Sequence, residues 1–345
     1  MRVAVCNTQV PFTEGGGEAH GRQLTAALRR HGVEAELVEL PFRSFPVRHL
    51  ARQMLAWRLV DVTEAAGLRI DRVIALRFPS YLVNHPDKVA WVVHQHRSAY
   101  DLWGHPLGDL SGTEEGDRLR EMIRTADAAA LRSARRVHAN SKTVASRLQR
   151  YNGVASEPLY HPPPDAERIR RGPFGDYVLC PGRLEPIKRQ EVLLEAMALT
   201  RSGGRCILAG TGAHEAALRR LVAERGLEGR VVLAGHVGRD ELLALYAGAR
   251  AVFYGPFDED YGYVTLEAFL SAKPVLTLAD SGGPLEFVED GENGFVLPAD
   301  PREIAQAIDA LMEDPARAAR LGRRGEETVR AMNLSWDRVV ETLLA

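Results

Sequence analysis

Short apolar runs rich in β-branched residues alternate along the chain with longer segments whose apolar residues recur every three or four positions. The first pattern predicts buried strands and the second predicts amphipathic helices. The strands expected in the first half of the chain are 3–7, 34–40, 72–76, 89–94 and 136–140. Those expected in the second half are 177–180, 205–210, 230–235, 250–255, 274–278 and 294–298. Strands that alternate with helices in this way are typical of parallel sheets covered by helices, so we predict an α/β fold.

The series of strands restarts after LYHPPPDAERIRRGPFGDY (159–177), a segment rich in proline and arginine and poor in periodic apolar residues. Such a composition is typical of an interdomain linker. We predict an N-terminal Rossmann-like domain over 1–167, a C-terminal one over 168–325, and a last helix within 326–345 that returns to the first domain. Sheets of this kind bind ligands at the carboxyl ends of their strands, so we expect the site in a cleft between the domains.

Composition narrows the class of protein. The chain has 345 residues, of which 45% are hydrophobic and 26% charged, as in a soluble globular protein with room for two cores. A formal net charge of -2 gives no electrostatic reason to expect nucleic acid as a partner. The three cysteines lie far apart in apolar runs, which indicates neither a disulfide framework nor a zinc site. The N-terminus begins directly with a strand, and no apolar run approaches the roughly 20 residues that span a bilayer. We therefore expect a protein of a reducing, cytoplasmic compartment.

A glycine cluster follows the first strand, in TEGGGEAHGRQLTAALRRHG (13–32). Glycines let the backbone approach a ligand closely, and the start of the following helix attracts phosphate. Glycine-rich turns are common in this fold class, and this one is not the G-x-G-x-x-G dinucleotide pattern. A ligand-binding role and a purely structural role are therefore equally supported here.

Two cations, Arg183 and Lys188, follow the first strand of the second domain in YVLCPGRLEPIKRQEVLLEAM (177–197). A loop at the end of a strand is a place where charge-assisted donors can converge on a pyrophosphate. Only four of the 44 basic residues are lysine, which argues against Lys188 serving solubility alone. A surface ion pair between Arg183 and Glu185 is the less favoured alternative.

Two glutamates, Glu259 and Glu267, are separated by seven residues in FDEDYGYVTLEAF. The first is expected in the loop after a strand, and the second in the first turns of a helix over 262–273, beside its core face. Both carboxylates can then face one cleft, with backbone amides of the turn directed at an anion.

A further loop, DSGGPLEFVEDGENGFVLP (280–298), contains the paired glycines Gly282 and Gly283 and the acidic Glu286. It either forms a tight turn that supports the cleft or contacts the ligand directly, and the sequence favours neither role.

Taken together, the segments GRLEPIK, LAGTG, LAGHVGRDELLALYAGARAVFYGP, EDYGYVTLE and SGGPLEFVEDGENGFVLP resemble the retaining glycosyltransferases of family 4. The resemblance covers essentially the whole chain and is most specific over 177–298. It implies the GT-B fold, with two Rossmann-like domains. It also implies transfer of a hexosyl unit from a UDP- or GDP-sugar to an acceptor hydroxyl with retention, in glycan, glycolipid or surface polysaccharide synthesis.

Seven residues match the family's donor-binding positions: Gly16, Arg183, Lys188, Val237, Tyr263, Val264 and Glu267. By the resemblance, the two cations hold the diphosphate and the glutamate holds the ribose hydroxyls. Val237 lies by the base, and Gly16 approaches the phosphate. Tyr263 and Val264 contribute backbone at the diphosphate and sugar.

Two residues match catalytic positions of the family. Glu259 would contact hydroxyls of the donor sugar beside the anomeric carbon and stabilise an oxocarbenium-like transition state. His94, at the end of WVVH, matches the cleft histidine, and His96 is the alternative for that position. The histidine is expected to donate a hydrogen bond to sugar or phosphate rather than act as a general base.

The chain departs from the family at two places, with Lys188-Arg189 where many relatives have Lys-Gly, and EDYG where they have EGFG. Contacts with the donor sugar are therefore expected to differ. Asp258, Glu259 and Asp260 imitate the D-x-D metal motif of another glycosyltransferase fold, but the two-sheet organisation belongs to the metal-independent type. We expect no metal and no cofactor other than the nucleotide-sugar co-substrate, because cations and helix N-termini can take the place of Mg²⁺.

Two other functions remain compatible with the sequence. One is a sugar phosphorylase or nucleotide-sugar epimerase on the same fold, and the other is a catalytically silent subunit that binds sugar nucleotides. Three kinds of acceptor are compatible with the sequence: a glycan, a lipid-linked molecule and a small molecule.

Segment 41–60, PFRSFPVRHLARQMLAWRLV, interleaves arginines with apolar residues. This pattern is compatible with peripheral contact with the inner face of an anionic membrane. An arginine-rich helix packed on its own sheet is the favoured alternative.

Overall fold

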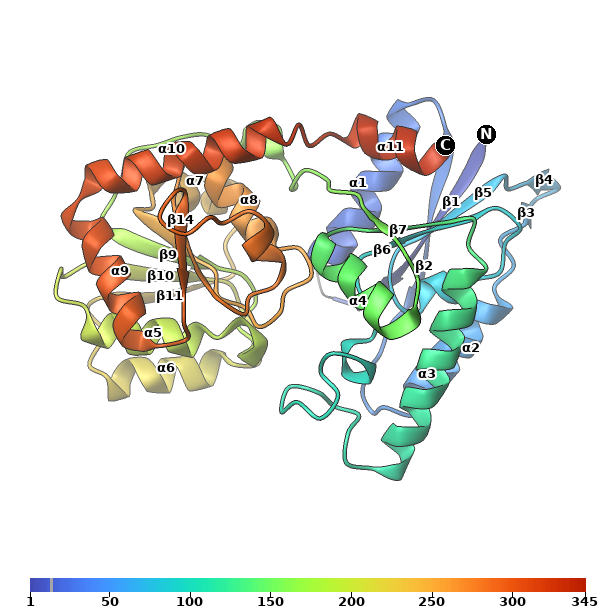
Figure 1. Cartoon of the computed structure of the whole chain (residues 1–345), viewed down its shortest axis with the longest axis horizontal. Helices are drawn as coiled ribbons and strands as arrows, with labels where there is room; N and C mark the ends of the chain where they lie inside the picture. The colour runs from blue at the N-terminus through green and yellow to red at the C-terminus, as the bar shows by residue number, and fades with distance from the viewer. Residues whose placement is uncertain (13–14) are drawn as a thin grey trace. The chain divides into compact units, whose positions relative to one another are not determined.

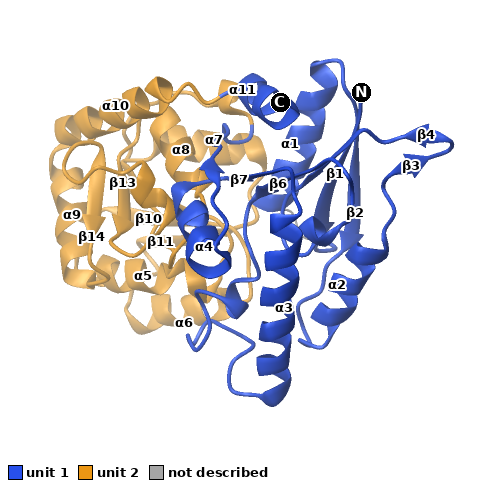
Figure 2. Cartoon of the chain, turned by 45° about the vertical axis from the view of Figure 1, so that its right-hand side comes forward, with its two compact units in different colours: residues 1–164, 335–345 blue, residues 165–334 orange. Residues whose placement is uncertain are grey.

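The computed structural model describes residues 1–12 and 15–345. Thr13 and Glu14, which open the predicted glycine-rich stretch, lie outside the described residues. The chain divides into two compact units, Met1–Pro164 with Ser335–Ala345, and Asp165–Leu334 (Figure 2). Each unit contains one six-stranded parallel sheet, as the alternating pattern predicted.

The sheet of the first unit has the order β2-β1-β5-β6-β7-β8. Its strands are β1 Arg2–Gln9, β2 Glu34–Pro41, β5 Arg72–Ala75, β6 Lys88–Val92, β7 Arg136–Ala139 and β8 Glu157–Pro158. A small hairpin, β3 Glu64–Ala65 and β4 Leu68–Arg69, lies outside this sheet. The helices of the unit are α1 Gly16–Arg30, α2 His49–Leu59, α3 Glu114–Arg132, α4 Lys142–Asn152 and α11 Trp336–Leu344, with short 3₁₀ turns at Ser80–Leu82 and Arg97–Ala99.

Strand β1 is buried on both faces, which explains its continuous apolar run. Val3 and Val5 belong to a core shared with α1 and α11, whereas Ala4 and Cys6 face the core that includes α2, α3 and α4. Figure 1 shows α11 beside α1, where the buried Val339, Val340 and Leu343 of α11 join the core of the first unit.

The sheet of the second unit has the order β11-β10-β9-β12-β13-β14. Its strands are β9 Tyr177–Pro181, β10 Arg205–Ala209, β11 Val231–Gly235, β12 Ala251–Phe253, β13 Val275–Leu278 and β14 Gly294–Leu297. The helices are α5 Gln190–Leu199, α6 Glu215–Glu224, α7 Arg239–Gly248, α8 Tyr263–Leu270, α9 Pro301–Glu313 and α10 Pro315–Ala331, with 3₁₀ turns at Ala166–Arg168, Pro186–Lys188 and Gly283–Glu286. The order of the strands reverses between β9 and β12, and in such sheets ligands bind outside the carboxyl ends of the strands at that point.

The chain leaves the second unit at Leu334, whereas the sequence predicts this change between residues 325 and 326. The reason is the packing of α10 against α8. A Cβ atom at Gly325 would lie 2.2 Å from the Phe269 ring, so the absence of a side chain at Gly325 allows the two helices to approach closely. The change into the second unit falls at Pro164 and Asp165, three residues before the predicted 167 and 168.

Every strand predicted from the sequence is present. The helix predicted over 262–273 is shorter and spans Tyr263–Leu270, because Gly262 precedes it with φ 88° and Ala272 follows it with φ 54°. Among the residues that the structure describes, no helix is both long enough and apolar enough to cross a membrane.

Candidate active site

Lys188 and Glu259 meet at the reversal point of the second sheet. Lys188 ends the 3₁₀ turn after β9, and Glu259 lies in the loop after β12, which pairs with β9. The Lys188 Nζ contacts Glu259 Oε2 and lies 3.4 Å from the Tyr254 hydroxyl, and that hydroxyl donates to Glu259 Oε2 at 2.9 Å. Both charged side chains are less than one-fifth exposed. The structure therefore brings together one predicted cation and one predicted carboxylate.

The loop after β13 fixes the backbone of Glu259. The amide of Glu259 donates to Ser281 O at 2.8 Å, and the amide of Gly283 donates to Glu259 O at 2.7 Å. Gly282 has φ 69°, and a Cβ there would lie 2.6 Å from Glu259 O. Segment 280–298 therefore supports the loop that carries Glu259.

Arg189 occupies the position where many relatives have the glycine of a Lys-Gly pair. Its φ of 54° is a left-handed backbone, which glycine adopts without strain. The guanidinium donates to Gly255 O and Pro256 O, each at 2.8 Å, and makes a bidentate contact with Asp280 at 2.6 and 2.8 Å. Arg189 thus ties the loop after β12 to the loop after β13 beside Glu259.

Glu267 lies on α8 and has partners of its own. Arg239 Nη1 donates to its Oε1 at 2.7 Å, and the Tyr246 hydroxyl donates to its Oε2 at 2.8 Å. Burial raises the pKa of Glu267, while the Arg239 cation and the Tyr246 hydroxyl oppose this rise. The two glutamates of the sequence motif are therefore held by different sets of side chains.

The remaining predicted residues of the second unit lie on three segments. Arg183 is about half exposed, and its Nη1 lies 2.8 Å from Glu185 Oε1, so the ion pair that the sequence analysis disfavoured is present. Val237 is half-buried between β11 and α7, and Tyr263 and Val264 form the first turn of α8.

The first unit contains the other two predicted residues. Gly16 is exposed and is the first residue of α1. His94 is half-buried in the loop after β6, and its Nδ1 lies 3.0 Å from Gln95 O. The alternative, His96, stacks against Phe78 with ring centroids 5.3 Å apart, and burial lowers its pKa to about 4. His96 thus packs against a core residue of the first unit.

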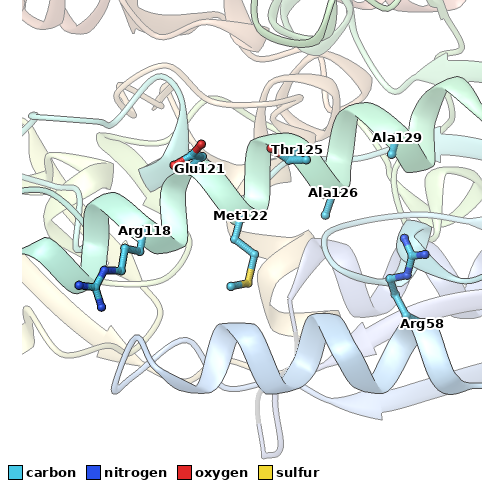
Figure 3. A pocket seen from close by; sticks show the side chains of 7 residues that line it. All are labelled: Arg58, Arg118, Glu121, Met122, Thr125, Ala126 and Ala129. Carbon is cyan, nitrogen blue, oxygen red and sulfur yellow. The ribbon is translucent and has the colours of Figure 1, made fainter.

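The arginine-rich segment 41–60 includes α2 and the turn before it, and its apolar residues divide between the core and the surface. Leu50, Met54 and Trp57 are buried in the core, whereas Phe45, Leu55 and Leu59 are 77%, 58% and 73% exposed. A hollow of about 530 Å³ lies between α2 and α3, with Met122 of α3 directed toward α2 (Figure 3). The side chains that line it within the described part of the chain are Arg58, Arg118, Glu121, Met122, Thr125, Ala126 and Ala129, and they include none of the predicted site residues.

Sequence reasoning did not single out Tyr254, Arg239 or Tyr246. Tyr254 directly follows β12 and looks like one more apolar strand residue, and Tyr246 looks like the core face of a helix. Arg239 stands two residues after Val237, so its proximity to a predicted site residue was the one available signal.

Comparison with known proteins gives a consistent match. Residues 169–328 match the family described as Glycosyl transferases group 1. The chain is 30% identical over 300 residues to the D-inositol 3-phosphate glycosyltransferase of Acidothermus cellulolyticus, a match that covers 73% of this chain and 66% of the relative. The chain spans between 43% and 66% of the length of three curated relatives with that name.

Solved structures match over almost the full chain. The sucrose-phosphate synthase of Thermosynechococcus elongatus superposes with a TM-score of 0.78 at 20% identity, covering 99% of this chain and 97% of that one. HepE of Anabaena in complex with UDP-glucose has a TM-score of 0.71 at 20% identity, covering 100% and 98%. These likenesses and the two parallel six-stranded sheets confirm the predicted GT-B fold.

Proposed function

Because the chain belongs to the group 1 glycosyl transferases, we propose that it transfers a hexosyl unit from a UDP- or GDP-sugar to an acceptor hydroxyl, with retention at the anomeric carbon. The observation that carries this proposal is the contact of Lys188 with Glu259 between the ends of β9 and β12. This is the place where a doubly wound sheet binds nucleotides.

The first step of the proposed reaction is departure of the diphosphate, which the protein's cations would support. The bond between the anomeric carbon and the phosphate oxygen breaks, and its electron pair leaves with the diphosphate. Lys188 and Arg183 stabilise that developing negative charge. Lys188 has three N–H donors, so it can contact a phosphate oxygen and Glu259 at the same time.

The acceptor side completes the exchange. The acceptor oxygen attacks the same face of the sugar, forms the new carbon–oxygen bond, and passes its proton to the departing phosphate oxygen. Glu259 holds the sugar hydroxyls and stabilises the positive charge on the ring, since its carboxylate is fixed by Tyr254 and by the loop after β13. His94 donates a hydrogen bond to sugar or phosphate.

UDP-glucose and D-inositol 3-phosphate are the first substrates to test, because the first is bound in the HepE structure and the second names the relatives. We expect release of UDP that requires the acceptor and a product with the α configuration of the donor, measured by NMR. EDTA is expected to leave the rate unchanged, because protein cations supply the positive charge.

The rivals give different outcomes in the same assay. A phosphorylase requires inorganic phosphate, and an epimerase changes the sugar without an acceptor product. A β-configured product contradicts retention. A silent subunit binds the nucleotide but releases nothing with any donor and acceptor pair.

A further inference from the structure

Arg239, the first residue of α7, lies between two carboxylates of the second unit. Its Nη1 donates to Glu267 Oε1 at 2.7 Å, and its Nε donates to Asp165 Oδ2 at 3.1 Å. The Arg239 side chain is 27% exposed, whereas that of Glu267 is 7% exposed. A partly accessible cation is thus fixed on a nearly buried carboxylate, two residues after the predicted base-binding Val237.

Helix α7 holds both oxygens of the Glu267 carboxylate. The second oxygen accepts from the hydroxyl of Tyr246, which is fully buried on the same helix. An ionised carboxylate has about four acceptor positions, so two hydrogen bonds leave capacity for two further O–H donors. A carboxylate fixed at both oxygens presents this capacity in one direction, which suits a pair of neighbouring hydroxyls.

We propose that Arg239 is a positioning residue that makes the donor site selective for ribonucleotides, by holding the Glu267 carboxylate in place as the acceptor for the ribose hydroxyls. This inference rests on the proposed function, because it takes Glu267 as the ribose-binding group. It goes further by assigning to the Arg239–Glu267 pair the discrimination between ribose and 2′-deoxyribose.

The charge of Arg239 matters as well as its geometry. Burial raises the pKa of Glu267, and the Arg239 cation is the largest opposing influence. Without the cation, the carboxyl group binds a proton at higher pH and then donates at one oxygen instead of accepting. Tyr246, Tyr263 and Asp165 are further titratable groups close to this carboxyl or its partner.

Asp165 orients Arg239 from the other side. Arg168 lies 3.8 Å from the same Asp165 oxygen and also contacts Asp240 of α7, so charges of alternating sign connect Asp165 to the start of the helix. The backbone of Asp165 has φ 51°, a conformation that asparagine tolerates. Asp165→Asn therefore removes the charge with little change of shape.

The test compares binding of UDP, GDP and ADP with binding of their 2′-deoxy forms by calorimetry, over pH 5 to 8. The variants are Arg239→Met, Arg239→Lys and Asp165→Asn. Arg225→Met is the matched control, because Arg225 forms an ion pair with Glu195 on α5 that touches no predicted site residue. Thermal unfolding of each variant confirms that it is folded.

We expect the wild type to prefer one ribonucleotide over its 2′-deoxy form by about 10-fold or more, as for a hydrogen bond to a charged group. Arg239→Met should bring that ratio close to one and shift the loss of binding at acid pH to higher pH. Arg239→Lys should recover part of the ratio, Asp165→Asn should lower it partly, and Arg225→Met should leave it unchanged.

Two results overturn the inference in distinguishable ways. If a folded Arg239→Met variant keeps the wild-type ratio and pH profile, Arg239 does not position Glu267 for ribose, while the proposed function stands. If the wild type binds none of the nucleotides, the proposed function fails and the role of Arg239 fails with it.

Discussion

The ammonium group of Lys188 contacts the carboxylate of Glu259 although the two residues stand 71 positions apart in the sequence. The sheet explains this contact. Strand β9 pairs with β12, so the loops that follow these two strands emerge side by side. Both charged groups are largely enclosed. They lie at the end of the sheet where a nucleotide-sugar ligand is expected to bind.

Replacing Glu259 separates binding of the donor from catalysis. We expect Glu259→Gln to lower kcat by about 100-fold or more at little change in donor Kd, because the lost charge acts on the transition state. Glycosyl transfer and nucleotide-sugar titration on the same preparation measure both quantities.

The Glu259→Gln substitution also removes the negative charge that pairs with Lys188. Tyr254→Phe is the matched control, because it removes the neutral hydrogen bond to Glu259 and keeps the carboxylate. If Glu259→Gln transfers sugar at the rate of the wild type, Glu259 is not a catalytic residue.

Arg189 is expected to contribute stability that outweighs its backbone strain. Arg189→Gly relieves the left-handed φ of 54° but removes the hydrogen bonds to Gly255, Pro256 and Asp280. We expect a net loss of about 1–2 kcal/mol in the free energy of unfolding, measured by urea denaturation. Arg205→Gly, at an exposed pair with Asp176, should cost less. An Arg189→Gly variant more stable than the wild type would show that strain outweighs the contacts.

The buried histidines of the first unit should make the protein sensitive to acid. His20 Nδ1 lies 2.9 Å from His161 Nε2, in a cluster with Trp91 and Trp336. Burial lowers the pKa of His20 to about 3, so the folded state binds fewer protons than the unfolded state below pH 6.5. The free energy of unfolding should therefore decrease as the pH falls from about 6.5 toward 4, by roughly 3 kcal/mol for His20 alone.

Substitution isolates that contribution. In His20→Gln, the dependence of the free energy of unfolding on pH should be flatter between pH 6.5 and 4 than in the wild type. His236→Gln is the control, because His236 is exposed and its replacement should leave the slope unchanged. An unchanged slope in His20→Gln would exclude His20 as a source of acid sensitivity.

The strands and the positions of Lys188 and Glu259 just after two of them were predictable for a physical reason. Parallel strands buried on both faces give continuous apolar runs, and the charged residues Lys188 and Glu259 stand just beyond two of those runs. The two-residue strand β8 and the hairpin β3–β4 are too short to give any period.

The partners of the site residues were not predictable in the same way. Arg239 of α7 contacts Glu267 of α8 across 28 positions of the sequence, which no local pattern encodes. Tyr254 could equally have been a core residue, since its ring is buried and its hydroxyl alone reaches Glu259. Pairings of this kind depend on tertiary packing.

Thermal unfolding with UDP, GDP, ADP and their sugar conjugates tests whether Lys188 and Glu259 form part of a nucleotide-sugar donor site. A ligand at ~100 times its Kd adds about 2.7 kcal/mol of stability, which raises the midpoint by a few degrees in a protein of this size. We predict that one nucleotide family stabilises the wild type and Lys142→Met, an exposed lysine variant on α4, but stabilises Lys188→Met much less. Equal stabilisation of Lys188→Met and the wild type, or no stabilisation by any of these ligands, would exclude Lys188 from a nucleotide-sugar donor site.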